Sequence, residues 1–180
     1  WEVVNKANVG LELGLFNGMV DLQFDLFDER RHNIFMPRES IPITAGFIKQ
    51  PWDNYGKMKN QGAEVTLNIN KQFNKNLFVS LMGTLTYAHN EITEKDEPAA
   101  VVGTNRAETG YPTGQNRGYI AERLFTNDDF ADVAAGTLKE GIPAQTFTAK
   151  LRPGDIKYVD VNQDGKIDAF DVSPIGGPIN

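Results

Sequence analysis

The residues best suited to chemistry lie near the end of the chain, in the twelve-residue run from Asp160 to Asp171. Side-chain oxygens occupy positions 1, 3, 5, 9 and 12 of this run, and a main-chain carbonyl is available at position 7. An all-oxygen set rich in carboxylates suits a hard cation and favours Ca²⁺ over octahedral Mg²⁺. The predicted metal ligands are Asp160, Asn162, Asp164, Lys166 (through its carbonyl), Asp168 and Asp171.

Two neighbouring residues support this EF-hand-like calcium loop, 160–171. Gly165 stands where the loop turns sharply, and Ile167 is the apolar residue that would anchor the loop inward. Asp171 occupies a position where Glu is more usual, which shortens the reach of that carboxylate. A solvated turn rich in Asp and Asn is the alternative interpretation. The segment before the loop looks extended and Pro174 soon follows, so we expect a structural staple and not a sensor with paired helices.

Composition limits the classes of protein that the chain can represent. The 180 residues are 40% hydrophobic and 23% charged, which predicts a folded domain or part of a larger one. A net charge of -6 argues against a nucleic-acid partner, and the absence of cysteine excludes disulfides and thiolate metal sites. No apolar run is long enough for a membrane-spanning helix. Because the chain opens at Trp1 with no leader, we expect a processed chain or an internal fragment.

The chain carries no enzyme signature. Its two histidines, His32 and His89, have no nucleophile motif near them and are interpreted as surface residues. Asp128 and Asp129 adjoin a predicted short helix that Thr126 or Asn127 would cap, so their charges complement a helix start. We therefore predict that the protein is not an enzyme.

Strict alternation of apolar and polar residues predicts two β-hairpins. In the first, strands at about 7–16 and 19–28 flank Asn17-Gly18, a dipeptide typical of a two-residue type I′ turn. This turn sets a register that places apolar residues opposite one another throughout, whereas a slip of one residue would mix the two faces. The predicted pairs are Leu15 with Val20, Leu13 with Leu22, Leu11 with Phe24, and Val9 with Leu26.

The second hairpin has predicted strands at about 62–71 and 77–90, joined by a short polar link. The connections outside the hairpins are much longer. We predict that residues 1–90 form barrel-wall hairpins with an outer loop at 29–61, and that residues 91–180 form a long, mostly irregular outer loop region containing the calcium loop. All nine prolines fall outside these predicted strands, as expected for residues that remove a ladder donor.

The alternation fits two kinds of protein. A soluble antiparallel sheet with one buried face has the same pattern. A transmembrane β-barrel has strands of about ten residues, an apolar face toward lipid, short turns at one end and long loops at the other. The unequal connections favour the barrel, and an exported, calcium-stabilised soluble β binding module remains the alternative.

Several sequence blocks resemble one family, the SusC/RagA-type TonB-dependent outer-membrane receptors, in its C-terminal half. The most specific block is Gly154 to Asp168, which is similar to the family pattern Gly-Asp-x-Lys-Tyr-x-Asp-x-Asn-x-Asp-Gly-x-Ile-Asp. The others, in the same order as in the family, are Asn8–Glu12 through Leu15–Gly18, Asp25–Asp28, and Asn60–Val65.

The resemblance implies part of a large barrel that imports oligosaccharides or peptides with energy from TonB. It also implies a SusD-like surface lipoprotein as partner, contact with outer-membrane lipid, and a location in the cell outer membrane with the calcium loop on the extracellular side. The chain departs from a complete receptor because no plug, TonB-contacting segment or aromatic-ended closing strand is recognisable in it. TonB would therefore act through an N-terminal part that this sequence does not contain.

Overall fold

The computed structural model describes residues 1–177 of the chain, apart from the side chain of Ile43. The chain forms two compact units: unit 1 comprises residues 1–96 and 108–113, and unit 2 comprises residues 97–107 and the chain from 114 onward. The final three residues of the region expected at 91–180 lie outside the described residues. Within residues 1–177, no helix is long and apolar enough to cross a membrane.

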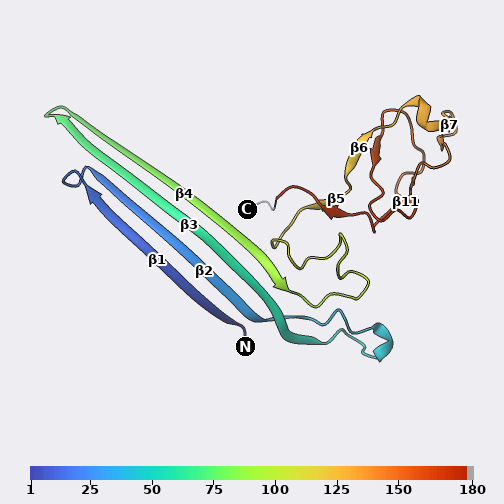
Figure 1. Ribbon diagram of the computed structural model, residues 1–180, viewed down its shortest axis with the longest axis horizontal. Helices are drawn as coiled ribbons and strands as arrows, with labels where there is room; N and C mark the ends of the chain where they lie inside the picture. Colours follow the sequence, from blue (N-terminus) through green and yellow to red (C-terminus); the bar gives the residue numbers. More distant parts are fainter. Residues whose placement is uncertain (178–180) are drawn as a thin grey trace. The chain divides into compact units, whose positions relative to one another are not determined.

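Unit 1 is built on a four-stranded antiparallel sheet whose strands follow one another in chain order (Figure 1). The sheet is open, with the first and last strands at its edges. The mainly β fold made of antiparallel hairpins is therefore confirmed. The strands are β1 (Val3–Leu15), β2 (Val20–Pro37), β3 (Trp52–Asn74) and β4 (Leu77–Glu94).

The first hairpin has the predicted register, in which Leu15 lies opposite Val20 and Leu11 opposite Phe24. Its turn has φ of 57° at Asn17 and 81° at Gly18, and the N–H of Met19 donates to the carbonyl of Phe16 at 3.3 Å, as in a type I′ turn. Phe16 also has a positive φ, of 55°, and the regular strands stop at Leu15 and Val20, so the connection is wider than the two-residue turn predicted.

Apolar residues form continuous rows across all four strands, because the pairing of β2 with β3 also keeps apolar positions together. We call this side of the sheet the apolar face. Its rows are Leu15–Val20–Ile69–Leu81, Leu13–Leu22–Leu67–Gly83, Leu11–Phe24–Val65–Leu85 and Val9–Leu26–Ala63–Tyr87. The other side, the polar face, carries the intervening rows Gly14–Asp21–Asn68–Met82, Glu12–Gln23–Thr66–Thr84 and Gly10–Asp25–Glu64–Thr86.

The strands extend well beyond the apolar rows and beyond their predicted ends. β2 continues to Pro37 and β3 already begins at Trp52, so the connection expected at 29–61 is only 38–51 and contains the 3₁₀ turn η1 (Ile43–Ala45). The extensions mix charged and apolar side chains without a period of two, as at Arg31, Ile34 and Met58, so the alternation that marks a half-buried strand is lost. Cross-strand ion pairs join them instead, between Lys6 and Glu29, Lys57 and Glu94, and Lys59 and Glu91.

The link of the second hairpin is also shorter than expected. It consists of Lys75 and Asn76 alone, because β3 runs on to Asn74 and β4 starts at Leu77. The Asn74 side chain supports the turn by accepting the N–H of Asn76 at 2.9 Å. The two hairpin turns lie at the same end of the sheet, opposite the 38–51 loop (Figure 1).

Unit 2 is more regular than the sequence indicated, because four small strand pairs cross-link its loops: β6 with β10, β9 with β11, β5 with β12, and β7 with β8. These short strands carry too few residues to show a period. Their bounds are β5 (Arg117–Gly118), β6 (Ala121–Leu124), β7 (Phe130–Asp132), β8 (Thr137–Leu138), β9 (Ala144–Gln145), β10 (Ile156–Tyr158), β11 (Lys166–Ile167) and β12 (Ser173–Pro174).

A small hydrophobic core holds unit 2 together. Phe125, Phe130 and Leu151 are buried against one another, and Leu138 and Ile142 pack on them. The helix predicted after Thr126 is a single 3₁₀ turn, η2 (Asn127–Asp129). It stops after one turn because the next residue, Phe130, is buried in the core and already belongs to strand β7.

Candidate functional site

The apolar face of the sheet is exposed. The side chains of Val9 and Leu85 are 70% and 67% exposed, and their neighbours on both edge strands are also open. Among the described residues, the buried hydrophobic side chains are Ala107, Phe125, Phe130, Leu151 and Ile167, and all of them belong to unit 2. Among the described residues, the sheet therefore has no hydrophobic core of its own. Its exposed apolar rows can contact an apolar environment outside the chain.

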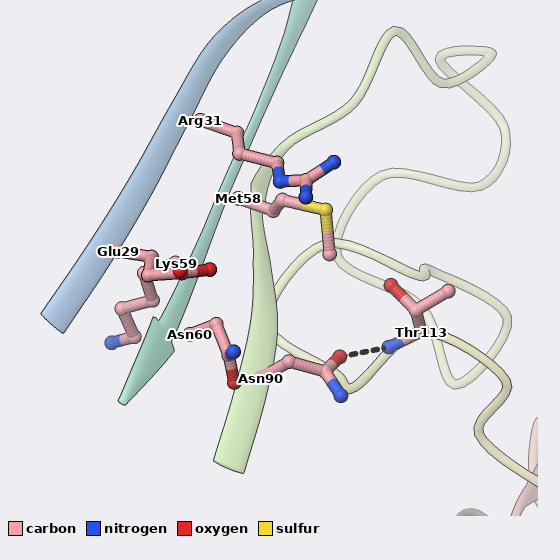
Figure 2. Close-up of a pocket in the computed structure, with 7 residues that line it drawn as sticks. All are labelled: Glu29, Arg31, Met58, Lys59, Asn60, Asn90 and Thr113. Atoms are coloured by element: carbon pink, nitrogen blue, oxygen red, sulfur yellow. Dashed lines mark hydrogen bonds between the residues drawn. The ribbon is translucent and has the colours of Figure 1, made fainter. Parts of the chain in front are cut away.

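The polar face carries a hollow of about 280 Å³ beyond the rows described above, where charged and amide side chains converge. Figure 2 shows the side chains of Arg31, Met58 and Asn90 directed toward the segment that contains Thr113, whereas the ammonium group of Lys59 points away from it. The N–H of Thr113 donates to Oδ1 of Asn90 at 2.7 Å. The remaining lining residues are Glu29 and Asn60.

Residues 108–113 lie beside the C-terminal part of strand β4, around Ile92. The N–H of Ile92 donates to the carbonyl of Tyr111 at 2.9 Å, and the N–H of Gly110 donates to the carbonyl of Ile92 at 2.8 Å. Lys95 and Glu108 add an ion pair at 2.9 Å. This segment therefore satisfies main-chain groups at one point of an otherwise open sheet edge and closes one side of the hollow.

Asp96 holds the loop between β2 and β3. Its Oδ2 accepts the Nε–H of Arg38 at 3.0 Å and, from Ser40, the main-chain N–H at 3.1 Å and the hydroxyl at 3.0 Å. Burial raises the pKa of the Asp96 carboxyl, but the hydrogen bonds from Ser40 and Arg38 outweigh it, so the pKa lies below its usual value. Nothing in the local sequence indicated this residue, because its partners are more than fifty positions away.

The first half of the predicted calcium loop brings three of the proposed ligands to one turn. The N–H of Asp164 donates to Oδ1 of Asp160 at 3.2 Å and to Oδ1 of Asn162 at 3.1 Å. The N–H of Gly165 donates to Oδ2 of Asp160 at 2.8 Å. Gly165 has a φ of 83°, which agrees with the sharp turn expected there.

The second half of the loop is organised by Asp171, which is fully buried. Its Oδ1 accepts the N–H of Val161 and its Oδ2 the N–H of Asp168, both at 2.8 Å. Asp168 turns its Oδ1 to the N–H of Phe170 at 2.8 Å. Ile167 is 1% exposed, so it anchors the loop inward as expected.

These contacts show what the carboxylates of the loop do in the structure. Within residues 1–177, no group of three or more His, Cys, Asp or Glu side chains is arranged to hold a metal ion. The loop carboxylates instead accept main-chain N–H groups. Each carboxylate oxygen has a second lone pair, so these hydrogen bonds are compatible with metal binding, and the donor set remains wholly oxygen.

Asp129 forms a bidentate ion pair with Arg123 in unit 2. Arg123 donates to both of its oxygens, at 2.7 Å and 2.6 Å, and the N–H of Thr126 donates to Oδ2 at 2.8 Å. The Arg123 guanidinium, followed by the Thr126 N–H, holds the pKa of the Asp129 carboxyl well below its ordinary value. Asp129 therefore fixes the turn that leads into the core, and its role is structural.

A sheet with one exposed apolar face and one polar face is the wall of a membrane β-barrel. The family model described as "TonB dependent receptor-like, beta-barrel" matches residues 1–173, and the chain belongs to this family of transport receptors. Within the family it is similar to receptors of the SusC/RagA type, in agreement with the sequence blocks.

Individual relatives support this assignment. The chain is 24% identical over 178 residues to the TonB-dependent receptor SusC of Bacteroides thetaiotaomicron, covering 95% of this chain and 16% of that protein. It is 27% identical over 183 residues to a TonB-dependent receptor of Formosa agariphila, covering 99% of this chain and 18% of that protein. The structure of the RagAB peptide importer in its closed-closed state matches with a TM-score of 0.61 at 21% identity, covering 97% of this chain and 18% of that one. The chain thus spans less than a fifth of the length of these relatives.

Proposed function

We propose that the chain supplies four wall strands and outer-loop elements to a TonB-dependent importer of the outer membrane. The exposed apolar face is the observation that carries this proposal, because a soluble binding module would bury such a face in its own core. The family and the RagAB likeness support nutrient import as the activity of the whole receptor. Oligosaccharides or peptides are the proposed cargo, and a SusD-like surface lipoprotein is the proposed partner.

In this proposal the polar face lines the barrel lumen, where water and cargo pass. The apolar rows contact lipid, and the polar extensions of the strands stand above the membrane on the extracellular side. TonB supplies energy through parts of the receptor outside this segment. The segment contributes walls and loops, not the energy-coupling step.

Uptake by cells that carry the whole receptor tests this proposal. Labelled oligosaccharides and labelled oligopeptides are offered separately to cells with the receptor, without it, and with the receptor but without TonB. We expect one of the two cargo classes to enter only when receptor and TonB are both present. Membrane fractionation accompanies the assay, and recovery of the receptor as a water-soluble protein without detergent would contradict the proposal.

We also propose that the loop 160–171 binds Ca²⁺ on the extracellular side of the receptor. Asp160, Asn162 and Asp164 already converge on one turn, and Lys166, Asp168 and Asp171 complete the proposed ligand set. The bound ion would offset the repulsion between carboxylates and hold the loop in place, with no catalytic part.

Chelation of the purified receptor tests the calcium proposal. EGTA should raise hydrogen exchange in residues 160–171, and added Ca²⁺ should restore protection. Asp164→Ala should abolish this response, whereas Asp132→Ala, which removes an exposed carboxylate bonded to the N–H of Ala135, should leave it intact. Equal exchange with Ca²⁺ and with EGTA in the unmodified receptor would contradict the proposal.

A further inference from the structure

A second hollow of about 520 Å³ lies beyond the end of the apolar rows, and most of its lining residues occupy positions on the apolar side of the sheet. On the apolar side of the sheet the lining carries two lysines, an arginine, a histidine and two neutral amides. They are Lys57, Lys59, Arg30, His32, Asn5 and Gln61, and the lining is completed by Arg31, Met58 and Thr93. No carboxylate belongs to the lining.

The strand register gives the position of this hollow along the strands, relative to the apolar rows. On the apolar face, the row after Val9–Leu26–Ala63–Tyr87 is Ala7–Asp28–Gln61–His89, and the next is Asn5–Arg30–Lys59–Glu91. Each row advances two residues, so the basic side chains start roughly 13 Å along the strands from the last apolar row. Long basic side chains at this height can reach back toward a membrane surface.

Two neighbouring irregularities of the sheet shape the hollow. The pairing of β2 with β3 shifts between Arg31 and Ile34, and the pairing of β3 with β4 shifts between Lys57 and Met58. Asn33, inside the first shift, has a φ of 57°. β-Bulges bend a strand and redirect its side chains, so two bulges at one level on adjacent strand pairs open a concave site in the sheet.

Three carboxylates outside the lining balance the formal charges of Arg30, Lys57 and Lys59. Arg30 contacts Asp28 at 3.0 Å, Lys57 contacts Glu94 at 2.5 Å and Lys59 contacts Glu91 at 2.8 Å. These pairs are accessible to solvent and therefore weak. An ammonium group has three donors and a guanidinium five, so each cation keeps donors for a further anion. The bordering carboxylates hold the three cations around the hollow without filling it.

We propose that this hollow binds the headgroup phosphate of an anionic membrane lipid. The unesterified oxygens of a headgroup phosphate share a negative charge and accept hydrogen bonds, which matches the converging ammonium and guanidinium donors. The acyl chains of the same lipid would lie on the apolar rows below. This inference rests on the proposed contact between the apolar face and lipid, and it assigns a lipid site to the polar margin of that face.

Lipid titration of the whole purified receptor tests the proposal. The melting temperature in detergent is followed while phosphatidylglycerol is added, and in parallel phosphatidylcholine with the same acyl chains. Phosphatidylglycerol should stabilise the receptor at lower concentrations. The triple variant Arg30→Gln, Lys57→Gln, Lys59→Gln should require roughly tenfold more phosphatidylglycerol or more for the same shift, with its response to phosphatidylcholine unchanged.

Two further variants act as controls. Lys6→Gln breaks the ion pair with Glu29 on the polar face at the same height and should leave the lipid response unchanged. The variant Lys57→Gln, Glu94→Gln, Lys59→Gln, Glu91→Gln preserves net charge and leaves no carboxylate without its partner, so it remains informative if the triple variant does not fold. It should lose the preference for phosphatidylglycerol, because the ammonium donors are gone.

Three results would overturn the proposal. One is an unchanged phosphatidylglycerol response in the charge-balanced variant, and another is equal stabilisation by the two lipids. The third is full replacement of phosphatidylglycerol by inorganic phosphate, which would assign the hollow to a soluble anion. A spin label at position 85 separates this inference from the proposed function. If the label reports hydrocarbon and the receptor still shows no preference for phosphatidylglycerol, this inference fails and the proposed function stands.

Discussion

Phe27 on β2 lies opposite Gly62 on β3, and its ring occupies the space that a side chain at position 62 would need. A Cβ at this position would collide with that ring and with the main-chain oxygen of Tyr87. An aromatic ring packed over a glycine covers main chain that would otherwise be bare, a device that helps to fix strand register. The pair lies on the polar face, just beyond the polar rows that it continues.

Gly62→Ala should therefore destabilise the folded receptor by about 1–3 kcal/mol, because the clash involves main-chain atoms as well as a ring. Gly83→Ala is the matched control: Gly83 lies in the same sheet, and no atom lies within 4 Å of the position that an added methyl group would take. Urea unfolding in detergent measures both. Equal midpoints for Gly62→Ala and the unmodified receptor would show that Phe27 moves aside without cost.

Asp171→Asn should loosen the predicted calcium loop at both ends. Asn offers a single oxygen acceptor, so either Val161 or Asp168 loses the partner of its N–H, at a cost of about 1–3 kcal/mol in a buried site. Hydrogen exchange of residues 160–171 should rise in EGTA as well as in Ca²⁺. Asp132→Asn serves as the exposed control, and unchanged exchange in Asp171→Asn would contradict the structural role of Asp171.

The contact between Arg123 and Asp129 should make the stability of unit 2 depend on acid. The folded-state pKa of Asp129 lies below its ordinary value of 3.8, so the stabilisation is complete above that value and is lost as the pH falls through the folded-state pKa. Asp129→Asn should thus be less stable than the unmodified receptor near neutral pH, and the gap should shrink toward about pH 2.

Hydrogen exchange around η2, corrected for the pH dependence of the intrinsic rate, measures this gap. Asp132→Asn controls for the general effect of removing a carboxylate from unit 2. A gap between Asp129→Asn and the unmodified receptor that is the same at neutral and acid pH would contradict the assignment.

The sequence predicted the parts of the fold in which local pattern and tertiary structure agree. Asn17-Gly18 and the alternation on either side of it determine both the turn and the pairing of Leu15 with Val20. The strand ends were missed, because Lys57 and Glu94 extend the sheet where charged and apolar residues are mixed and no alternation survives. Once the register is known, such opposite charges on paired positions become a usable signal.

The contacts within unit 2, and those that fix the loop 38–51, join residues that are distant in sequence. Asp96 meets Ser40 across 56 positions, and Asn105 donates to the carbonyl of Val172 across 67. Two-residue strands such as β9 and β11 carry no period at all. The oxygen spacing of the calcium loop was visible in sequence, yet the main-chain contacts of Asp171 became visible only with the fold.

The most direct test of the central claim is the environment of adjacent residues on β4. The sequence has no cysteine, so single cysteines at Leu85 and Thr86 can be introduced into this segment and spin-labelled in the receptor reconstituted in lipid. Leu85 is in an apolar row and Thr86 in a polar row. The label at 85 should be accessible to oxygen dissolved in hydrocarbon, and the label at 86 to a water-soluble nickel chelate. Accessibility of both labels to the chelate, with little oxygen exposure at 85, would contradict the central claim.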